Sequence, residues 1–84
     1  MRKEVLGRYI VADPEICHGK PTFRGTRIMV WQVIDQVANG MAWETIVDEW
    51  RGRITKDAIA EAVRLAKDSF IENAKRNKRE KATA

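Results

Sequence analysis

The residues with the clearest chemical potential lie together in one segment, HGKPTFRGTRI, at positions 18–28. Its side chains that can carry positive charge are His18, Lys20, Arg24 and Arg27. Turn-forming residues open and close this segment, namely Gly19 with Pro21 and the pair Gly25-Thr26. The backbone must therefore turn twice and hold these cations close together. Such a cluster suits phosphate binding, and it predicts a small regulatory binding module and not an enzyme.

Two roles remain open for these cations. Lys20, Arg24 and Arg27 are candidates for contacts with the DNA backbone, because Lys and Arg near exposed backbone N–H groups bind phosphates. The alternative for Arg27 is an ion pair with Asp13 or Glu15, which would fix the connection between two strands.

Residue types used in catalysis are present but poorly arranged. Cys17 and His18 are neighbours in a turn and lack a third group that would orient them for nucleophilic chemistry. The carboxylates that a metal nuclease would need occupy helical positions typical of solvent-facing residues, namely Asp35, Asp48, Glu49 and Asp57. We therefore expect no catalytic site, no metal or other cofactor, and no small-molecule substrate.

Length and composition indicate one small soluble domain. A chain of 84 residues buries only about 60% of the surface that its unfolded form exposes, so a partner subunit is plausible from size alone. Cys17 is the only cysteine, which excludes an internal disulfide and is typical of a reducing compartment. Because the sequence shows neither a membrane-spanning run nor a secretory signal, we expect a cytoplasmic protein with no membrane contact.

The net charge of +4 resides near the C-terminus. Residues 75–81 contain five cations and one glutamate, so the rest of the chain is neutral overall. Basic ends of this kind either contact phosphates nonspecifically or are merely soluble, and both alternatives are open. We predict a single domain over residues 1–74 and a basic C-terminal tail over 75–84.

The apolar pattern predicts a short β-ribbon followed by helices. Tyr9–Ala12 and Arg27–Val30 are β-prone runs separated by turn signals, which indicates an antiparallel ribbon within residues 8–30. From Val30 the apolar residues recur at helical spacing until Asn39-Gly40. We expect helices at about 30–39, 43–50 and 55–75.

The third helix is expected to be long and to begin at Thr55, a good N-cap. Its core face would contain Ile59, Ala62, Val63, Ala66 and Phe70. Its short partner helix cannot cover this length, so the second half should pack on something else. A short second helix, a tight Gly-containing turn and a third helix together are the sequence form of a helix-turn-helix.

Several positions match a known family: Ile10, Asp13-Pro14, Gly19-Lys20-Pro21, Gly25-Thr26-Arg27-Ile28, Val30, Gly40, Glu44, Ile46, Thr55, Ile59 and Ala62. On these residues the chain resembles the domain-of-unknown-function family 433 over about residues 8–70, and Gly19–Ile28 is the specific part. The resemblance implies a mainly α fold, with a short N-terminal β-ribbon before a three-helix, homeodomain-like helix-turn-helix. It also implies an antitoxin of the VapB type that neutralises a PIN-like ribonuclease toxin and represses their shared operon as a dimer.

The chain departs from the family pattern at two places. Ala42 stands where the family usually has a Ser or Thr that caps the second helix, which weakens the helix start by about 0.5–2 kcal/mol. The usual aromatic-proline turn is replaced by Trp50-Arg51-Gly52-Arg53. Base-reading residues are therefore not carried over from the family.

The third helix offers one basic flank. The face opposite its core carries mostly acids, whereas the flank beside that face carries Lys56, Ala60, Arg64 and Lys67. If this helix reads DNA, the basic flank must face the groove. The alternative is a solvated mixed-charge face held by Glu61–Arg64 and Arg64–Asp68 pairs.

The excess length of the third helix, together with apolar residues beside the predicted core faces, indicates an interface with a second protomer or with the toxin. The interface candidates are Trp31, Leu65, Phe70, Ile71, Ala74, Arg76 and Arg79. Arg76 and Arg79 are candidates to enter the acidic metal site of a PIN-like nuclease.

The leading hypothesis from sequence is a dimeric antitoxin that binds double-stranded operator DNA and a PIN-like toxin. The alternative is an adaptor that inhibits its partner protein and does not recognise a DNA sequence.

Overall fold

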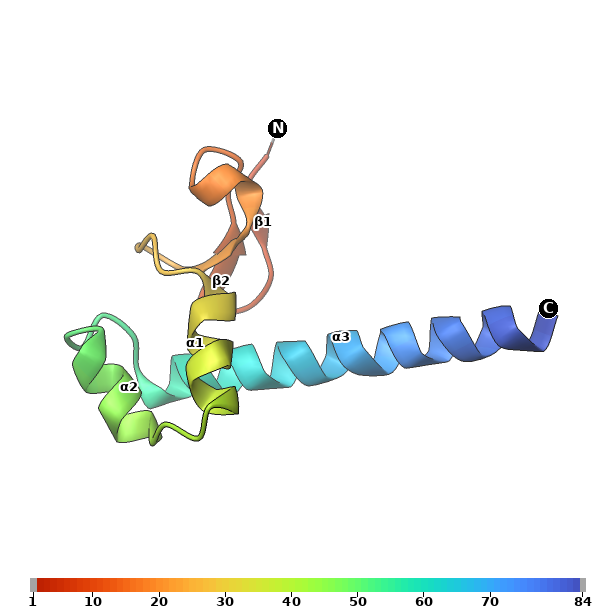
Figure 1. Cartoon of the computed structure of the whole chain (residues 1–84). Coiled ribbons are helices and arrows are strands. Elements are labelled where there is room, and N and C mark those ends of the chain that lie inside the picture. The colour runs from red at the N-terminus through yellow and green to blue at the C-terminus, as the bar shows by residue number, and fades with distance from the viewer. Residues whose placement is uncertain (1, 84) are drawn as a thin grey trace.

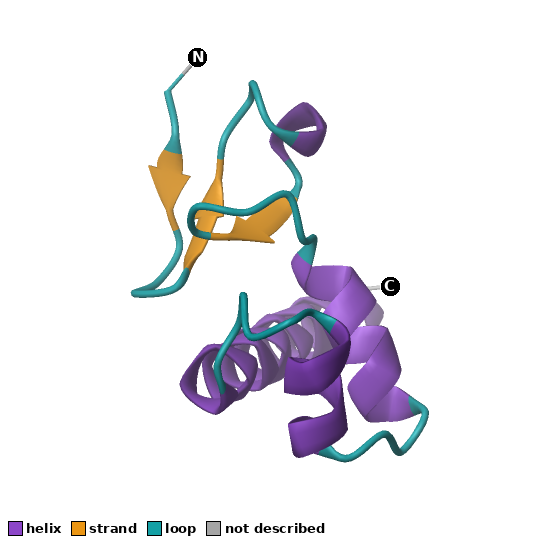
Figure 2. Ribbon diagram, turned by 90° about the vertical axis from the view of Figure 1, so that its left-hand side faces the viewer, coloured by secondary structure: helices purple, strands orange, loops and turns teal. Residues whose placement is uncertain are grey.

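The computed structural model describes the backbone of residues 2–83 and the side chains of residues 2–75. A small sheet precedes three helices along the chain (Figure 1). The strands are β1 (Glu4–Val5), β2 (Ile10–Ala12) and β3 (Pro21–Phe23), and the helices are α1 (Val30–Ala38), α2 (Trp43–Glu49) and α3 (Lys56–Thr83). The sheet lies on one side of the helices (Figure 2). The predicted succession of a small N-terminal β element and three helices is confirmed.

The sheet differs from the ribbon expected. β2 pairs antiparallel with β3, and β1 adds a third strand at the other edge of β2. The prediction that Arg27–Val30 is the partner strand of β2 was wrong. The hydroxyl of Thr26 accepts the N–H of Ile28 (3.0 Å) and donates to the carbonyl of Phe23 (2.8 Å), which turns the chain sharply after β3. This segment therefore folds back onto β3, where Met29 forms a single bridge, and leads into α1.

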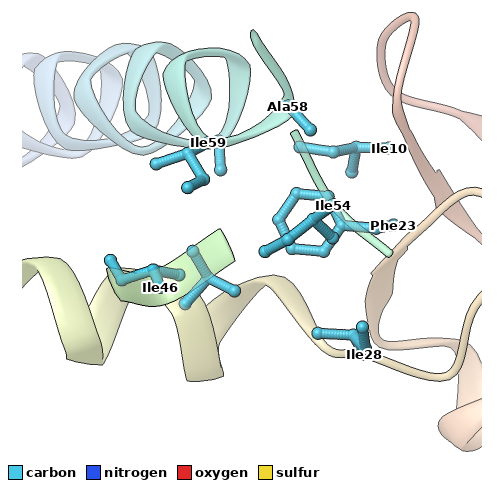
Figure 3. Packing of buried hydrophobic residues seen from close by; sticks show 9 residues of the cluster. Ile10, Phe23, Ile28, Ile46, Ile54, Ala58 and Ile59 are labelled. Carbon is cyan, nitrogen blue, oxygen red and sulfur yellow. The ribbon is translucent and has the colours of Figure 1, made fainter. Parts of the chain in front are cut away.

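The core lies between the sheet and the helices. Its buried apolar residues are Ile10, Phe23, Ile28, Val33, Ile46, Ile54, Ala58, Ile59 and Ala62. Side chains from β2, β3, α2 and α3 converge there (Figure 3). Because each large apolar side chain contributes about 1.5–3 kcal/mol on burial, this one cluster joins the sheet and the helices into a unit.

α1 and α2 end in the same hydrogen-bond pattern. After α1, the N–H groups of Gly40 and Met41 donate to the carbonyls of Val37 and Gln36, and Gly40 is left-handed with φ of 82°. This is the Schellman motif, in which glycine is favoured because it has no Cβ. The predicted end of the first helix at Asn39-Gly40 is confirmed.

At the end of α2 an arginine takes the left-handed position. Arg51 has φ of 56°, and the N–H groups of Arg51 and Gly52 donate to the carbonyls of Asp48 (3.0 Å) and Val47 (2.9 Å). A non-glycine residue in this conformation costs about 1 kcal/mol or more. The connection between α2 and α3 is short and spans residues 50–55.

α3 is longer than expected, and in the part with described side chains residues 66–75 are exposed. It spans 28 residues, or about 42 Å at 1.5 Å per residue, and continues to Thr83 instead of ending near residue 75. After Gly52 the sequence contains no glycine or proline that would end a helix. Ile59 and Ala62 are buried, but Phe70 is 65% exposed, so its placement in the core was wrong. Within the described residues, no helix has both the length and the apolar character that a membrane crossing requires.

Candidate nucleic-acid interface

α2, the turn after it and the beginning of α3 are the region expected to approach DNA. Thr55 caps α3 as predicted, because its hydroxyl accepts the N–H of Ala58 at 3.2 Å. Ala42 provides no side-chain cap for α2. The Nε1 of Trp50 instead donates to Oε1 of Gln36 on α1 at 2.7 Å, which ties the end of α2 to α1. The region is thus held by α1 as well as by the core.

The basic flank of α3 is exposed to solvent. Lys56, Arg64 and Lys67 all have exposed side chains. The Nζ of Lys56 lies 3.2 Å from a carboxylate oxygen of Glu44 on α2, and the Nζ of Lys67 lies 3.9 Å from that of its neighbour Asp68. Exposed pairs of this kind contribute about 0–1 kcal/mol, so a phosphate can compete for these cations.

The exposed carboxyl of Glu44 titrates below its ordinary range. A backbone hydrogen bond at Glu44, followed by the hydrogen bond and charge of Lys56, lowers its pKa. The Glu44 carboxylate therefore stays ionised at neutral pH.

Glu61 does not belong to the solvated charge network considered for this helix. Its carboxylate accepts the backbone N–H groups of Arg8 (3.1 Å) and Tyr9 (2.8 Å) in the turn between β1 and β2. A Cβ at Gly7 would lie 2.7 Å from the Cδ of Glu61, so the glycine makes room for this approach. In the part of the chain with described side chains, Arg64 forms no ion pair. α3 therefore holds the sheet through Glu61 and leaves Arg64 to solvent.

Lys20 and Arg27, from the segment of residues 18–28, are exposed. The carboxylate of Asp13 accepts the N–H of Glu15 at 2.9 Å and stabilises the turn after β2. Among residues 2–75, Arg27 has no ion pair with either acid, so the structural alternative for it is wrong. The two cations remain available for a ligand.

Arg24 lies with two cations that the sequence analysis did not single out. Arg8, Arg24 and Arg53 line one pocket between the sheet and the start of α3. The three belong to three different turns, and no spacing along the chain indicates that they meet. Only the packing of the sheet against α3 brings them together.

The apolar interface candidates are largely uncovered. Those with exposed side chains are Trp31 (56%), Phe70 (65%), Ile71 (44%) and Ala74. Leu65 is half-buried and lines an apolar groove with Leu6 and Val30. The side chains of Arg76 and Arg79 lie outside the described residues. The structure thus leaves large apolar side chains uncovered on α3 and at the start of α1.

Comparison with known proteins gives one match. The family model described as "Protein of unknown function (DUF433)" matches residues 10–66, which include β2, β3, α1, α2 and the packed part of α3. No curated protein and no solved structure matches.

Proposed function

The chain belongs to the DUF433 family, and on that premise we propose that it is a DNA-binding antitoxin of a type II toxin–antitoxin pair. In this proposal a homodimer in the cytoplasm binds its operator through a homeodomain-like helix-turn-helix formed by α1, α2 and α3. The same protein neutralises a PIN-like ribonuclease toxin.

The observation that carries the DNA-binding part is the exposed basic flank of α3. Lys56, Arg64 and Lys67 lie on that flank, immediately after a short α2 and a tight turn. In a helix-turn-helix the second of the two consecutive helices enters the major groove with its N-terminal part. Lys20, Arg24 and Arg27 in the segment around β3 would add contacts with the phosphate backbone.

The first test is a fluorescence-anisotropy titration with the DNA upstream of the gene and with a scrambled duplex, at about physiological salt. We expect at least about tenfold tighter binding to the upstream DNA. Arg64→Gln should reduce this preference, whereas Lys3→Gln, which removes an exposed charge directly before β1, should not. Equal and weak binding of both duplexes would contradict sequence recognition.

A second candidate function is an adaptor that inhibits a partner protein without reading DNA. The exposed side chains of Trp31, Phe70 and Ile71 favour it, because large apolar residues outside a core often anchor protein interfaces. Copurification of the toxin encoded beside the gene, together with failure to distinguish the two duplexes, would select this function.

The proposed route of inhibition uses the basic C-terminal end. If Arg76 or Arg79 enters the acidic metal site of the nuclease, deletion of residues 75–84 should abolish inhibition of the purified toxin. Unchanged inhibition by the shortened chain would show that another surface blocks the nuclease.

A further inference from the structure

A pocket of about 160 Å³ lies where the sheet meets the N-terminal end of α3. Arg8, Arg24 and Arg53 are among its eight lining residues, and none of the eight is acidic. Arg8 comes from the turn between β1 and β2, Arg24 follows β3, and Arg53 lies between α2 and α3. The fold therefore concentrates positive charge from three distant parts of the chain at one place.

The guanidinium groups of this pocket are only lightly engaged. Nη2 of Arg24 donates to the carbonyl of Gly7 at 3.3 Å, and the Arg8 guanidinium lies 5.6 Å from the centre of the Tyr9 ring. A guanidinium has five N–H donors, so most donors remain for a ligand. Within the described side chains, none of the three arginines forms an ion pair.

The floor of the pocket is apolar. Phe23, Ile54 and Ala58 line it and are at most 3% exposed. A low-dielectric wall strengthens the field of nearby charges, and three cations around one space repel one another. An anion in the pocket would relieve that repulsion. The volume of the pocket is several times the volume of about 30 Å³ that one water molecule occupies in the liquid. A tetrahedral oxyanion can therefore enter it.

We propose that this pocket is a phosphate-binding site formed by Arg8, Arg24 and Arg53. The guanidinium fork matches the geometry of phosphate oxygens, and the charge and size of the pocket fit one such group. We assign the phosphate to a DNA backbone, an assignment that rests on the proposed function. Thr55 also lines the pocket, and the basic flank of α3 begins at the next residue, so one bound duplex can reach both.

The test compares DNA binding of the full-length protein with that of two single variants at several salt concentrations. Arg53→Gln removes a pocket cation whose side chain makes no hydrogen bond with the described residues. Arg2→Gln is the matched control, because Arg2 is exposed and lies at a different pocket. We expect Arg53→Gln to weaken binding about tenfold for upstream and scrambled DNA alike, and to lower the salt slope by about 1. Arg2→Gln should change neither quantity.

Two results would overturn the site while leaving DNA binding intact. In the first, the wild-type protein binds DNA and the Arg53→Gln variant binds it with the same affinity and the same salt slope. The other is an Arg2→Gln variant that loses as much affinity as Arg53→Gln, since the effect would then be one of net charge.

If the wild-type protein binds neither duplex, the proposed function fails. Binding of inorganic phosphate then tests whether the pocket is a phosphate site. The probe is the set of arginine Nε–Hε signals in NMR, followed during titration with phosphate and with chloride at equal ionic strength. Shifts of Arg8, Arg24 and Arg53 that are specific to phosphate and weaker in Arg53→Gln would establish a site for free phosphate. Absence of such shifts would overturn the proposal.

Discussion

The two halves of α3 both have an apolar face, but the rest of the molecule covers that face only in the first half. In the first half, Ile59 and Ala62 are fully buried against the sheet and the other helices. In the second half, Phe70 falls on the continuation of that face and is 65% exposed, because α3 extends beyond the rest of the molecule (Figure 1). Helical periodicity identifies an apolar face, but the neighbouring elements decide how far along the helix that face is covered.

The largest effect is expected in the packed half. Ile59→Ala should lower the free energy of unfolding by about 2–5 kcal/mol, because it leaves a cavity at a fully buried position. Urea denaturation followed by circular dichroism measures this loss. A decrease below about 1 kcal/mol would mean that the site collapses around the smaller side chain and that the packed half is less rigid than described.

A smaller loss is expected from the contact that joins this half to the sheet. Glu61→Ala removes the acceptor of two backbone N–H groups and should cost about 1–3 kcal/mol. Amide hydrogen exchange should become faster at Arg8 and Tyr9 before it does so in the core. The control is Glu72→Ala, an exposed acid on the unpacked half, which should leave both stability and exchange unchanged.

In the unpacked half, removal of a large apolar side chain should hardly alter the isolated chain. Phe70→Ser should change the free energy of unfolding by no more than about 0.5 kcal/mol, since the residue is exposed. Binding of the partner protein, measured by calorimetry, should be weakened. A loss of stability comparable to that of Ile59→Ala would contradict the division of α3 into a packed and an unpacked half.

The smallest effect concerns the exposed charge pair at the start of the packed half. Lys56→Gln should raise the pKa of Glu44 toward the ordinary value, while the backbone hydrogen bond keeps part of the lowering. Because the folded pKa is lowered, the backbone hydrogen bond and the Lys56 contact of the Glu44 carboxylate stabilise the fold above the ordinary pKa of a glutamate, and this stabilisation is lost as the pH falls through the lowered value. NMR titration of the Glu44 carboxyl carbon tests the shift. Lys67→Gln should leave it unchanged, and an unaltered pKa in Lys56→Gln would contradict the pairing.

The elements that depend on local signals could be predicted from the sequence. Apolar spacing predicted the three helices, Gly40 predicted the end of α1, and Thr55 predicted the cap of α3. The resemblance to family 433, stated over about residues 8–70 with Gly19–Ile28 as its specific part, is confirmed by the match over residues 10–66. The end of α1 and the cap of α3 are each encoded within a few neighbouring residues.

The features that depend on distant neighbours could not be predicted. β1 is only two residues long and carries no alternating pattern, so nothing in its own sequence indicated a strand. Glu61 was expected to face solvent, because the backbone N–H groups that donate to its carboxylate lie more than 50 positions earlier in the chain. The arginine pocket was missed for the same reason. Exposed cations such as Arg64 were recognised as candidates, because helical spacing alone places them on one flank of the third helix.

The contact of Glu61 with the β1–β2 turn indicates which residues belong to the unit that folds. The two backbone N–H groups that donate to this carboxylate belong to Arg8 and Tyr9, just before the family match begins at residue 10. A fragment cut at the boundaries of the match would lack β1 and would leave the carboxylate without its partners. The stable unit is therefore longer than the recognisable homology. Relatives that keep an acid at the position of Glu61 should also keep a small residue at that of Gly7, so the two sites are expected to vary together.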